Sequence, residues 1–124
     1  MGKRYLIDTN VISDYLSNKL PAKTSGMINK ITAQLSVITR IELLSWSDVS
    51  SRQLQILQNF IAVAIVYDLD EAIIIETIRI RKLYKIKLPD AIIAATALVN
   101  SLTLITRNIS DFRRISELDI LNPF

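Results

Sequence analysis

Tyr5-Leu6-Ile7-Asp8-Thr9-Asn10-Val11 is the stretch that decides the fold of this chain. Its first three residues predict a short buried strand, and a helical pattern begins at Val11. Asp8 therefore lies where a strand gives way to a helix. In an open sheet of parallel strands, the binding crevice forms at such junctions, beyond the carboxyl ends of the strands. Asp8 is the first candidate for a functional residue.

Three further acidic residues lie at comparable junctions between a predicted strand and a predicted helix. Four carboxylates that converge on one edge of a sheet would suit a divalent metal ion. Hard oxygen ligands favour Mg²⁺ or Mn²⁺ over softer transition metals. The three further acids are Glu42, Asp90 and Asp111.

Each acid also has a purely structural interpretation. Thr39–Glu42 spells a capping box, and Asn108–Asp111 begins with a capping residue and ends with an acid. Asp90 would lie in the first turn of a helix, where a negative charge is favourable. Four independent caps would not need to share one end of the sheet, whereas a metal site does. The four acids together therefore favour a metal site.

The residue types that the chain lacks exclude several chemistries. It contains no histidine and no cysteine. Ser-His-Asp and Cys-His catalysis both need an imidazole base, and a zinc site of the His/Cys type needs nitrogen or sulfur ligands. Acid–base chemistry and metal binding must therefore depend on Asp and Glu, helped by Lys, Tyr and water.

Length and composition predict one densely packed domain, residues 1–124, because half of the residues are hydrophobic and only two are Gly and three Pro. The basic start of the chain reaches Asp8 after three apolar residues, too few for a signal-peptide core of about 7–15. The most apolar stretch, Ala91–Val99, is far shorter than the roughly 20 residues of a membrane span. We therefore expect a cytoplasmic protein without a membrane segment.

Strand and helix patterns alternate along the chain. This alternation predicts an α/β fold with parallel strands and with helices on both faces of the sheet. The predicted strands are Tyr5–Ile7, Gln34–Ile38, Ala64–Tyr67, Thr103–Ile105 and Ile120-Leu121. The predicted helices are Val11–Ser17, Ala22–Ile31, Ile41–Trp46, Arg52–Ile61, Glu71–Tyr84 and Ala91–Val99.

The chain carries four acidic motifs, in the order Leu6–Ser13, Thr39–Leu43, Leu88–Ala97 and Leu104–Phe112. Together they resemble the PIN-domain ribonucleases, and within them the VapC-type toxins of type II toxin–antitoxin pairs. Any one motif is a weak signal, but four in order over nearly the whole chain are specific.

The resemblance implies a PIN-like fold, with five parallel strands in the order 3-2-1-4-5 and the acids at their carboxyl edge. It also implies an Mg²⁺- or Mn²⁺-dependent endoribonuclease that hydrolyses RNA phosphodiester bonds. Asp8 and Asp90 would be the principal metal ligands, and Glu42 and Asp111 would complete the site directly or through water. The implied partners are a second copy of the chain, in a homodimer, and a cognate VapB-type antitoxin that silences the enzyme.

Polar residues beside the acids are candidates for orienting the carboxylates or a substrate phosphate. Asn10, Thr106 and Asn108 could do so by hydrogen bonds, and capping of helices and turns is the alternative role. Arg40 and Arg107 lie next to acids in the motifs. They are candidates for binding a phosphate or for forming a structural ion pair.

Basic residues cluster ahead of Asp90 and around Asp111, although the net charge is only +3. They could neutralise phosphates on either side of the acidic site. A solvated helix face is the alternative interpretation of such a charge run. The residues are Arg79, Arg81, Lys82, Lys85, Lys87, Arg107, Arg113 and Arg114.

Two predicted helices carry apolar residues over more than one face. Such an excess indicates either a partner surface or a thick internal core. The residues are Leu54, Ile56, Leu57, Phe60 and Ile61 in one helix, and Ile73–Ile75, Ile78 and Ile80 in the other.

Two other classes of protein stay open as alternatives. A receiver-like module shares the doubly wound sheet, but it would carry paired acids after its first strand, where this chain has only Asp8. A PIN-like binding module without catalytic activity would lack one of the acids, and here all four are present.

Overall fold

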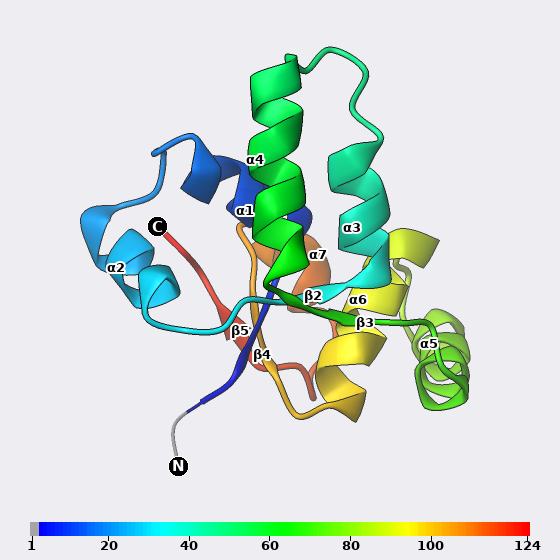
Figure 1. Ribbon diagram of the computed structural model, residues 1–124. Helices are drawn as coiled ribbons and strands as arrows, with labels where there is room; N and C mark the ends of the chain where they lie inside the picture. The colour runs from blue at the N-terminus through cyan, green and yellow to red at the C-terminus, as the bar shows by residue number, and fades with distance from the viewer. Residues whose placement is uncertain (1–2) are drawn as a thin grey trace.

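The structure is a computed structural model that describes residues 3–124, and helices surround its short central strands (Figure 1). The strands are β1 (Tyr5–Ile7), β2 (Gln34–Ser36), β3 (Ile65–Tyr67), β4 (Thr103–Ile105) and β5 (Ile120–Leu121). The helices are α1 (Thr9–Leu16), α2 (Ala22–Asn29), α3 (Val37–Leu44), α4 (Ser51–Ala62), α5 (Glu71–Leu83), α6 (Leu88–Val99) and α7 (Ile109–Phe112).

The strands form two parallel sheets rather than one. In the first sheet β4 pairs with both β1 and β5, and in the second β2 pairs with β3. Cα atoms of β1 and β2 approach within 8 Å, but no backbone ladder joins these two strands in the part of the chain that the structure describes. The expectation of a single five-stranded sheet in the order 3-2-1-4-5 is therefore not confirmed.

Helices cover both faces of the strands, as expected, because side chains alternate between the faces along each strand. Leu6 of β1 and Leu104 of β4 pack into one core with residues of α5, α6 and α7. The next residues along, Ile7 and Ile105, pack into a second core with residues of α1 to α4. Strands β1 and β4 are thus covered on both faces, which explains why their residues are mostly apolar.

Helix α3 begins at Val37 rather than at the expected Ile41. The predicted strand from Gln34 ends at Ser36, whose hydroxyl accepts a hydrogen bond from the backbone N–H of Ile38 at 3.1 Å and caps the helix. This cap outweighs the preference of Val and Ile for strands. The capping-box interpretation of Thr39–Glu42 is therefore wrong, since both residues lie inside α3.

Two other helices also begin earlier in the sequence than predicted. Helix α1 begins at Thr9, because Asp8 is its N-cap. Helix α6 begins at Leu88, because Pro89 is compatible with a first helical turn. The short helix α7 was not among the predicted helices. Among the described residues, no helix combines the length and the hydropathy that crossing a lipid bilayer requires.

Candidate active site

Asp8 is a buried carboxylate that two hydrogen bonds hold in place. Its Oδ1 accepts from the backbone N–H of Thr9 at 2.9 Å, and its Oδ2 accepts from the Thr106 hydroxyl at 2.8 Å. Its own N–H donates to the carbonyl of Ile105 at 3.0 Å, so the pairing of β1 with β4 continues into this residue. The capping interpretation of Asp8 is correct, and the second bond fixes the carboxylate beyond what a cap needs.

The pKa of Asp8 lies above its usual value of 3.8, chiefly because burial disfavours the charged form. The hydrogen bonds from Thr106 and Thr9 lower this pKa, and the negative charge of Glu42 raises it. A buried carboxylate beside another acid carries negative charge that the protein only partly compensates.

Glu42 lies well inside α3, not at a helix start. Its Oε1 accepts from the Thr9 hydroxyl at 2.6 Å, and the same Thr9 oxygen lies 3.1 Å from the Thr39 hydroxyl. A hydroxyl has a single proton to donate, so Thr39 must donate to Thr9 while Thr9 donates to Glu42. Thr9 therefore connects two of the acids, through its backbone to Asp8 and through its side chain to Glu42.

Asp90 lies in the first turn of α6, and its burial and the charges of all three other acids raise its pKa. Burial is the largest cause of its raised pKa, followed by the negative charges of Asp8, Asp111 and Glu42. Lys87 acts in the opposite direction. The fold therefore brings the four predicted acids into one electrostatic group, although they come from four separate segments of the chain.

Asp111 is half-buried in α7 and is oriented by Asn108. The side-chain amide of Asn108 donates to Asp111 Oδ2 at 3.0 Å, and the backbone N–H of Asn108 donates to the Thr106 hydroxyl at 3.0 Å. Asn108 occupies the N-cap position of α7 without making a side-chain cap. The same Thr106 hydroxyl donates to Asp8, so a short chain of hydrogen bonds links two of the acids.

The donor set of this group fits a hard divalent cation. Among residues 3–124, no three acidic side chains are close enough to enclose an ion as they stand. However, burial chiefly, and the negative charges of neighbouring acids in addition, raise the pKa values of Asp8 and Asp90, and a cation would favour their ionised forms. Four carboxylates with no nitrogen or sulfur ligand beside them match the preferences of Mg²⁺ and Mn²⁺.

The remaining predicted neighbours have different environments. Asn10 and Arg40 are exposed, and no hydrogen bond joins either to the four acids in the described structure. Arg107 forms an ion pair, with its Nε 3.5 Å from Asp14 Oδ2, and its charge also lowers the pKa of Asp8. Of its two predicted roles, phosphate binding and a structural ion pair, Arg107 therefore has the ion pair.

Three residues near the acids were missed by sequence reasoning. Thr9 directly follows Asp8, which is the one signal that could have singled it out. Thr39 was interpreted as a cap rather than as a hydroxyl donor. Asp14 lies three residues after Val11 on the buried face of α1, and an acid at an apolar position of a helix could have been recognised as unusual.

The sequence matches a model of the PIN domain over residues 5–118. The chain belongs to the PIN-domain family. This confirms the resemblance inferred from the four motifs and removes the receiver-like alternative. Members of the family are generally metal-dependent nucleases.

Several solved structures are similar to this PIN domain over nearly its whole length. A chain of the DNA-bound VapBC structure from Salmonella typhimurium is 27% identical with a TM-score of 0.81, covering 97% of this chain and 98% of that chain. A chain of a toxin–antitoxin complex from Klebsiella pneumoniae is 29% identical with a TM-score of 0.78 and the same coverage. A chain of FitAcB from Neisseria gonorrhoeae is 25% identical with a TM-score of 0.77, covering 96% and 97%. The comparison with curated proteins found no match.

Proposed function

We propose that this PIN domain is an Mg²⁺- or Mn²⁺-dependent endoribonuclease and the toxin of a VapBC-type toxin–antitoxin pair, with residues 1–124 acting as a single domain. The observation that carries the proposal is the convergence of acids from separate segments of the chain. Thr9 contacts both Asp8 and Glu42, and Thr106 and Asn108 link Asp8 to Asp111. The charges of these three acids also add to the effect of burial in raising the pKa of Asp90. A structural cap does not need three other acids within electrostatic range, whereas a cation site does.

In this proposal the four acids hold the ion, and the neighbouring polar groups orient the acids. A bound divalent ion would supply Lewis acidity that stabilises the charge developing on the phosphoryl oxygens. Thr106 and Thr9 hold the Asp8 carboxylate from two sides. Asn108 holds the carboxylate of Asp111. Neutral hydroxyl and amide donors fix these groups without cancelling the negative charge that attracts a cation.

The two sheets are proposed to act as one layer in the order 3-2-1-4-5. The observed pairings of β3 with β2, and of β1 with β4 and β5, supply both halves of that order. The short distance between β1 and β2 supports the remaining step. In such a layer Asp8 and Glu42 follow adjacent strands, consistent with their shared contact with Thr9.

Partner binding is proposed on two grounds. The similar solved structures are described as complexes of a toxin with an antitoxin, and we propose an antitoxin of the VapB type and a homodimer for this chain. Of the apolar residues that the sequence analysis named in two helices, some lie in the core and others on the surface. Leu57, Ile73 and Ile80 are buried, whereas Ile75 and Ile78 of α5 are 59% and 51% exposed.

A ribonuclease toxin would act on RNA in the cytoplasm.

Cleavage of a mixed RNA pool by the purified, antitoxin-free protein tests the ribonuclease assignment. We expect cutting with Mg²⁺ or Mn²⁺, none in EDTA, and none by Asp90→Asn with either metal, because the substitution removes one ligand charge. Asp48→Asn is the matched control, since Asp48 is exposed in the segment between α3 and α4, away from the acids. Undiminished cutting by a folded Asp90→Asn protein would remove Asp90 from the mechanism.

A further inference from the structure

An open basic groove of about 490 Å³ lies beside the acidic group. Its walls come from the end of α5, from the segment that joins α5 to α6, and from the region of α7. Four of the six lining residues are cationic, and one is an acid of the proposed active site. The lining residues are Arg81, Lys85, Ile86, Lys87, Asp111 and Arg114.

The two arginines of this groove are held in place by the backbone. Arg81 Nη1 donates to the carbonyl of Ile86 at 3.1 Å, and Arg114 Nη1 donates to the carbonyl of Lys85 at 2.8 Å. Because their acceptors are consecutive residues, the two guanidinium groups approach the same short stretch of chain. Each guanidinium has five N–H donors, so each keeps most of them for a ligand.

The groove cations form no ion pair in the part of the chain that the structure describes. Within residues 3–124, none of the four forms an ion pair within 4.0 Å, and the ion pairs that do form involve Lys3, Arg79 and Arg107. Arg79 of α5 pairs with both Glu76 and Glu117, so it is occupied by the fold. The four cations outnumber Asp111, the one acid that lines the groove. They therefore repel one another, and an anionic ligand would relieve this repulsion.

The groove adjoins the acidic group directly. Asp111 lines the groove and also contributes to the raised pKa of Asp90. Lys87, which also lines the groove, is the N-cap residue of α6, and Asp90 lies in the first turn of the same helix. A polyanion that enters the groove is therefore brought to the acids.

We propose that this groove binds the phosphodiester backbone of single-stranded RNA next to the bond that is cleaved. The proposal rests on the ribonuclease function proposed above. A positively charged groove that follows the backbone is the usual way to bind a single strand without reading its sequence. No aromatic residue is among those that line the groove, and Ile86 is the one apolar side chain there. The groove should therefore contact phosphates rather than stack on bases.

The test uses Lys85→Gln and Lys87→Gln, singly and together, because neither change removes a hydrogen bond that holds the groove. Binding of a short, fluorescein-labelled single-stranded RNA of mixed sequence is measured by anisotropy at several salt concentrations. Every protein also carries Asp90→Asn, so that the RNA stays intact. We expect the plot of log affinity against log salt to become less steep by about 0.7 for each lysine removed. The loss should be similar for RNAs of different sequence.

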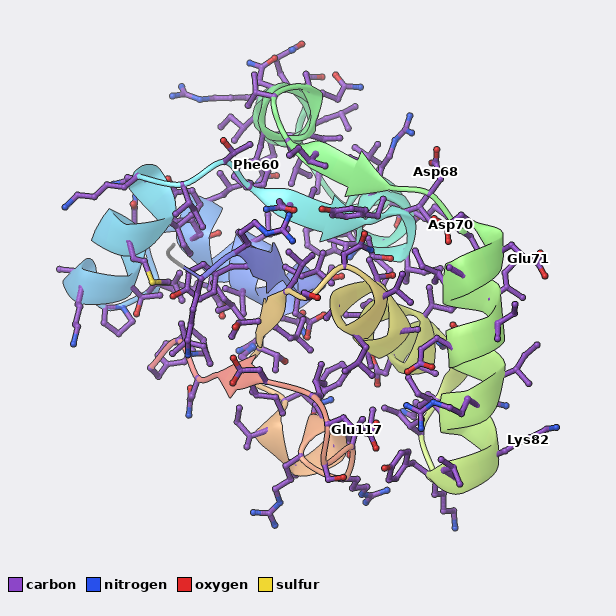
Figure 2. The ribbon with its side chains drawn as sticks, turned by 90° about the horizontal axis from the view of Figure 1, so that it is seen from below. Phe60, Asp68, Asp70, Glu71, Lys82 and Glu117 are labelled. Carbon is purple, nitrogen blue, oxygen red and sulfur yellow. The ribbon has the colours of Figure 1, made fainter. Side chains whose placement is uncertain are left out.

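Lys82→Gln is the matched control. Lys82 lies near the end of α5, three residues before Lys85. Its side chain points away from the body of the protein (Figure 2). Lys82→Gln removes the same net charge as either single groove variant, but Lys82 does not line the groove. We therefore expect no change in the salt slope. A slope that is unchanged in the double variant, or reduced equally by Lys82→Gln, would overturn the groove assignment. So would lysine-dependent binding of polyglutamate in the absence of RNA binding, which would point to an acidic protein segment.

Cleavage assays separate this proposal from the ribonuclease proposal. With Asp90 intact, Lys85→Gln should show a raised KM and a little-changed kcat, because Lys85 binds the substrate without touching the reacting atoms. Metal-dependent cleavage that needs Asp90 but has the same KM in Lys85→Gln contradicts the groove alone. Lysine-dependent RNA binding without any cleavage supports the groove and contradicts the ribonuclease.

Discussion

At the scale of single residues, threonine hydroxyls determine how the acids are held. Thr106 is fully buried and makes two contacts, donating to Asp8 Oδ2 and accepting from the backbone N–H of Asn108. Thr9 and Thr39 perform the corresponding task for Glu42. A hydroxyl can donate and accept at the same time, which suits a place where a carboxylate and a backbone amide both need a partner.

We predict that Thr106→Val impairs both stability and metal affinity. The change leaves a buried carboxylate oxygen and a backbone N–H without partners, which costs roughly 1–3 kcal/mol in the free energy of unfolding. Loss of a group that orients a ligand typically weakens metal affinity about 10- to 100-fold. Urea denaturation and titration calorimetry with Mn²⁺ measure the two effects.

Thr103→Val is the control for this prediction. Thr103 is another buried threonine of the same strand region, but its hydroxyl donates to Asp119, away from the four acids. We expect it to lower stability while leaving the affinity for Mn²⁺ unchanged. Equal loss of metal affinity in the two variants would show that Thr106 acts only through general stability.

At the scale of elements, the sequence predicts the order of strands and helices better than their boundaries. The burial of Leu6 and Ile7 on opposite faces follows from the apolar run in β1. The start of α3 depends instead on whether Ser36 or Thr39 becomes the cap, and both have suitable side chains. The pairing of strands is decided by distant contacts, so the separation of β1 from β2 has no local signal.

The acids themselves were predictable because each lies in a compact motif, whereas the contacts between motifs were not. Asp14 is an example, since its partner Arg107 lies far along the chain. The Asp14 side chain is 8% exposed, and its Oδ2 has no hydrogen-bond partner in the described residues apart from this ion pair. The pair ties α1 to the segment after β4, and its two members differ greatly in burial.

We predict opposite effects from removing the two members of this pair. Arg107→Gln leaves the buried Asp14 carboxylate without its cation and should lower the free energy of unfolding by about 1–3 kcal/mol. Asp14→Leu leaves only a half-exposed arginine, which water can solvate, and should be neutral or stabilising. Chemical denaturation of both variants at neutral pH measures the difference. Equal destabilisation would mean that Asp14 packs rather than pairs.

At the scale of the whole molecule, two pairs of acidic residues make the stability depend on pH in opposite directions. The pKa values of Asp8 and Asp90 are raised in the folded protein. Their contribution to stability is therefore present at low pH and is lost as the pH rises through the raised values. The pKa values of Glu117 and Asp119 are lowered, mainly by hydrogen bonds from Arg79 and Thr103. Their contribution is lost as the pH falls.

We predict that Asp90→Asn becomes increasingly stable relative to wild type as the pH rises from about 3 to neutral, measured in EDTA by urea denaturation. The comparison isolates Asp90, because every other titrating group is common to both proteins. Saturating Mg²⁺ should reduce the difference, since an ion at 100 times its dissociation constant adds about 2.7 kcal/mol to the wild type. A stability difference that is independent of pH would contradict the electrostatic coupling of the four acids.

Among the described residues, the absence of a backbone ladder between β1 and β2 leaves side chains to join the two sheets beside the acids. Glu42 belongs to the helix that follows β2, whereas Asp8 and Asp111 belong to segments that follow β1 and β4. The boundary between the two sheets therefore passes between the carboxylates. The hydroxyl of Thr9 crosses this boundary, because it contacts both Glu42 and Thr39 of α3. One small side chain thus makes a connection here that main-chain pairing makes between the other neighbouring strands.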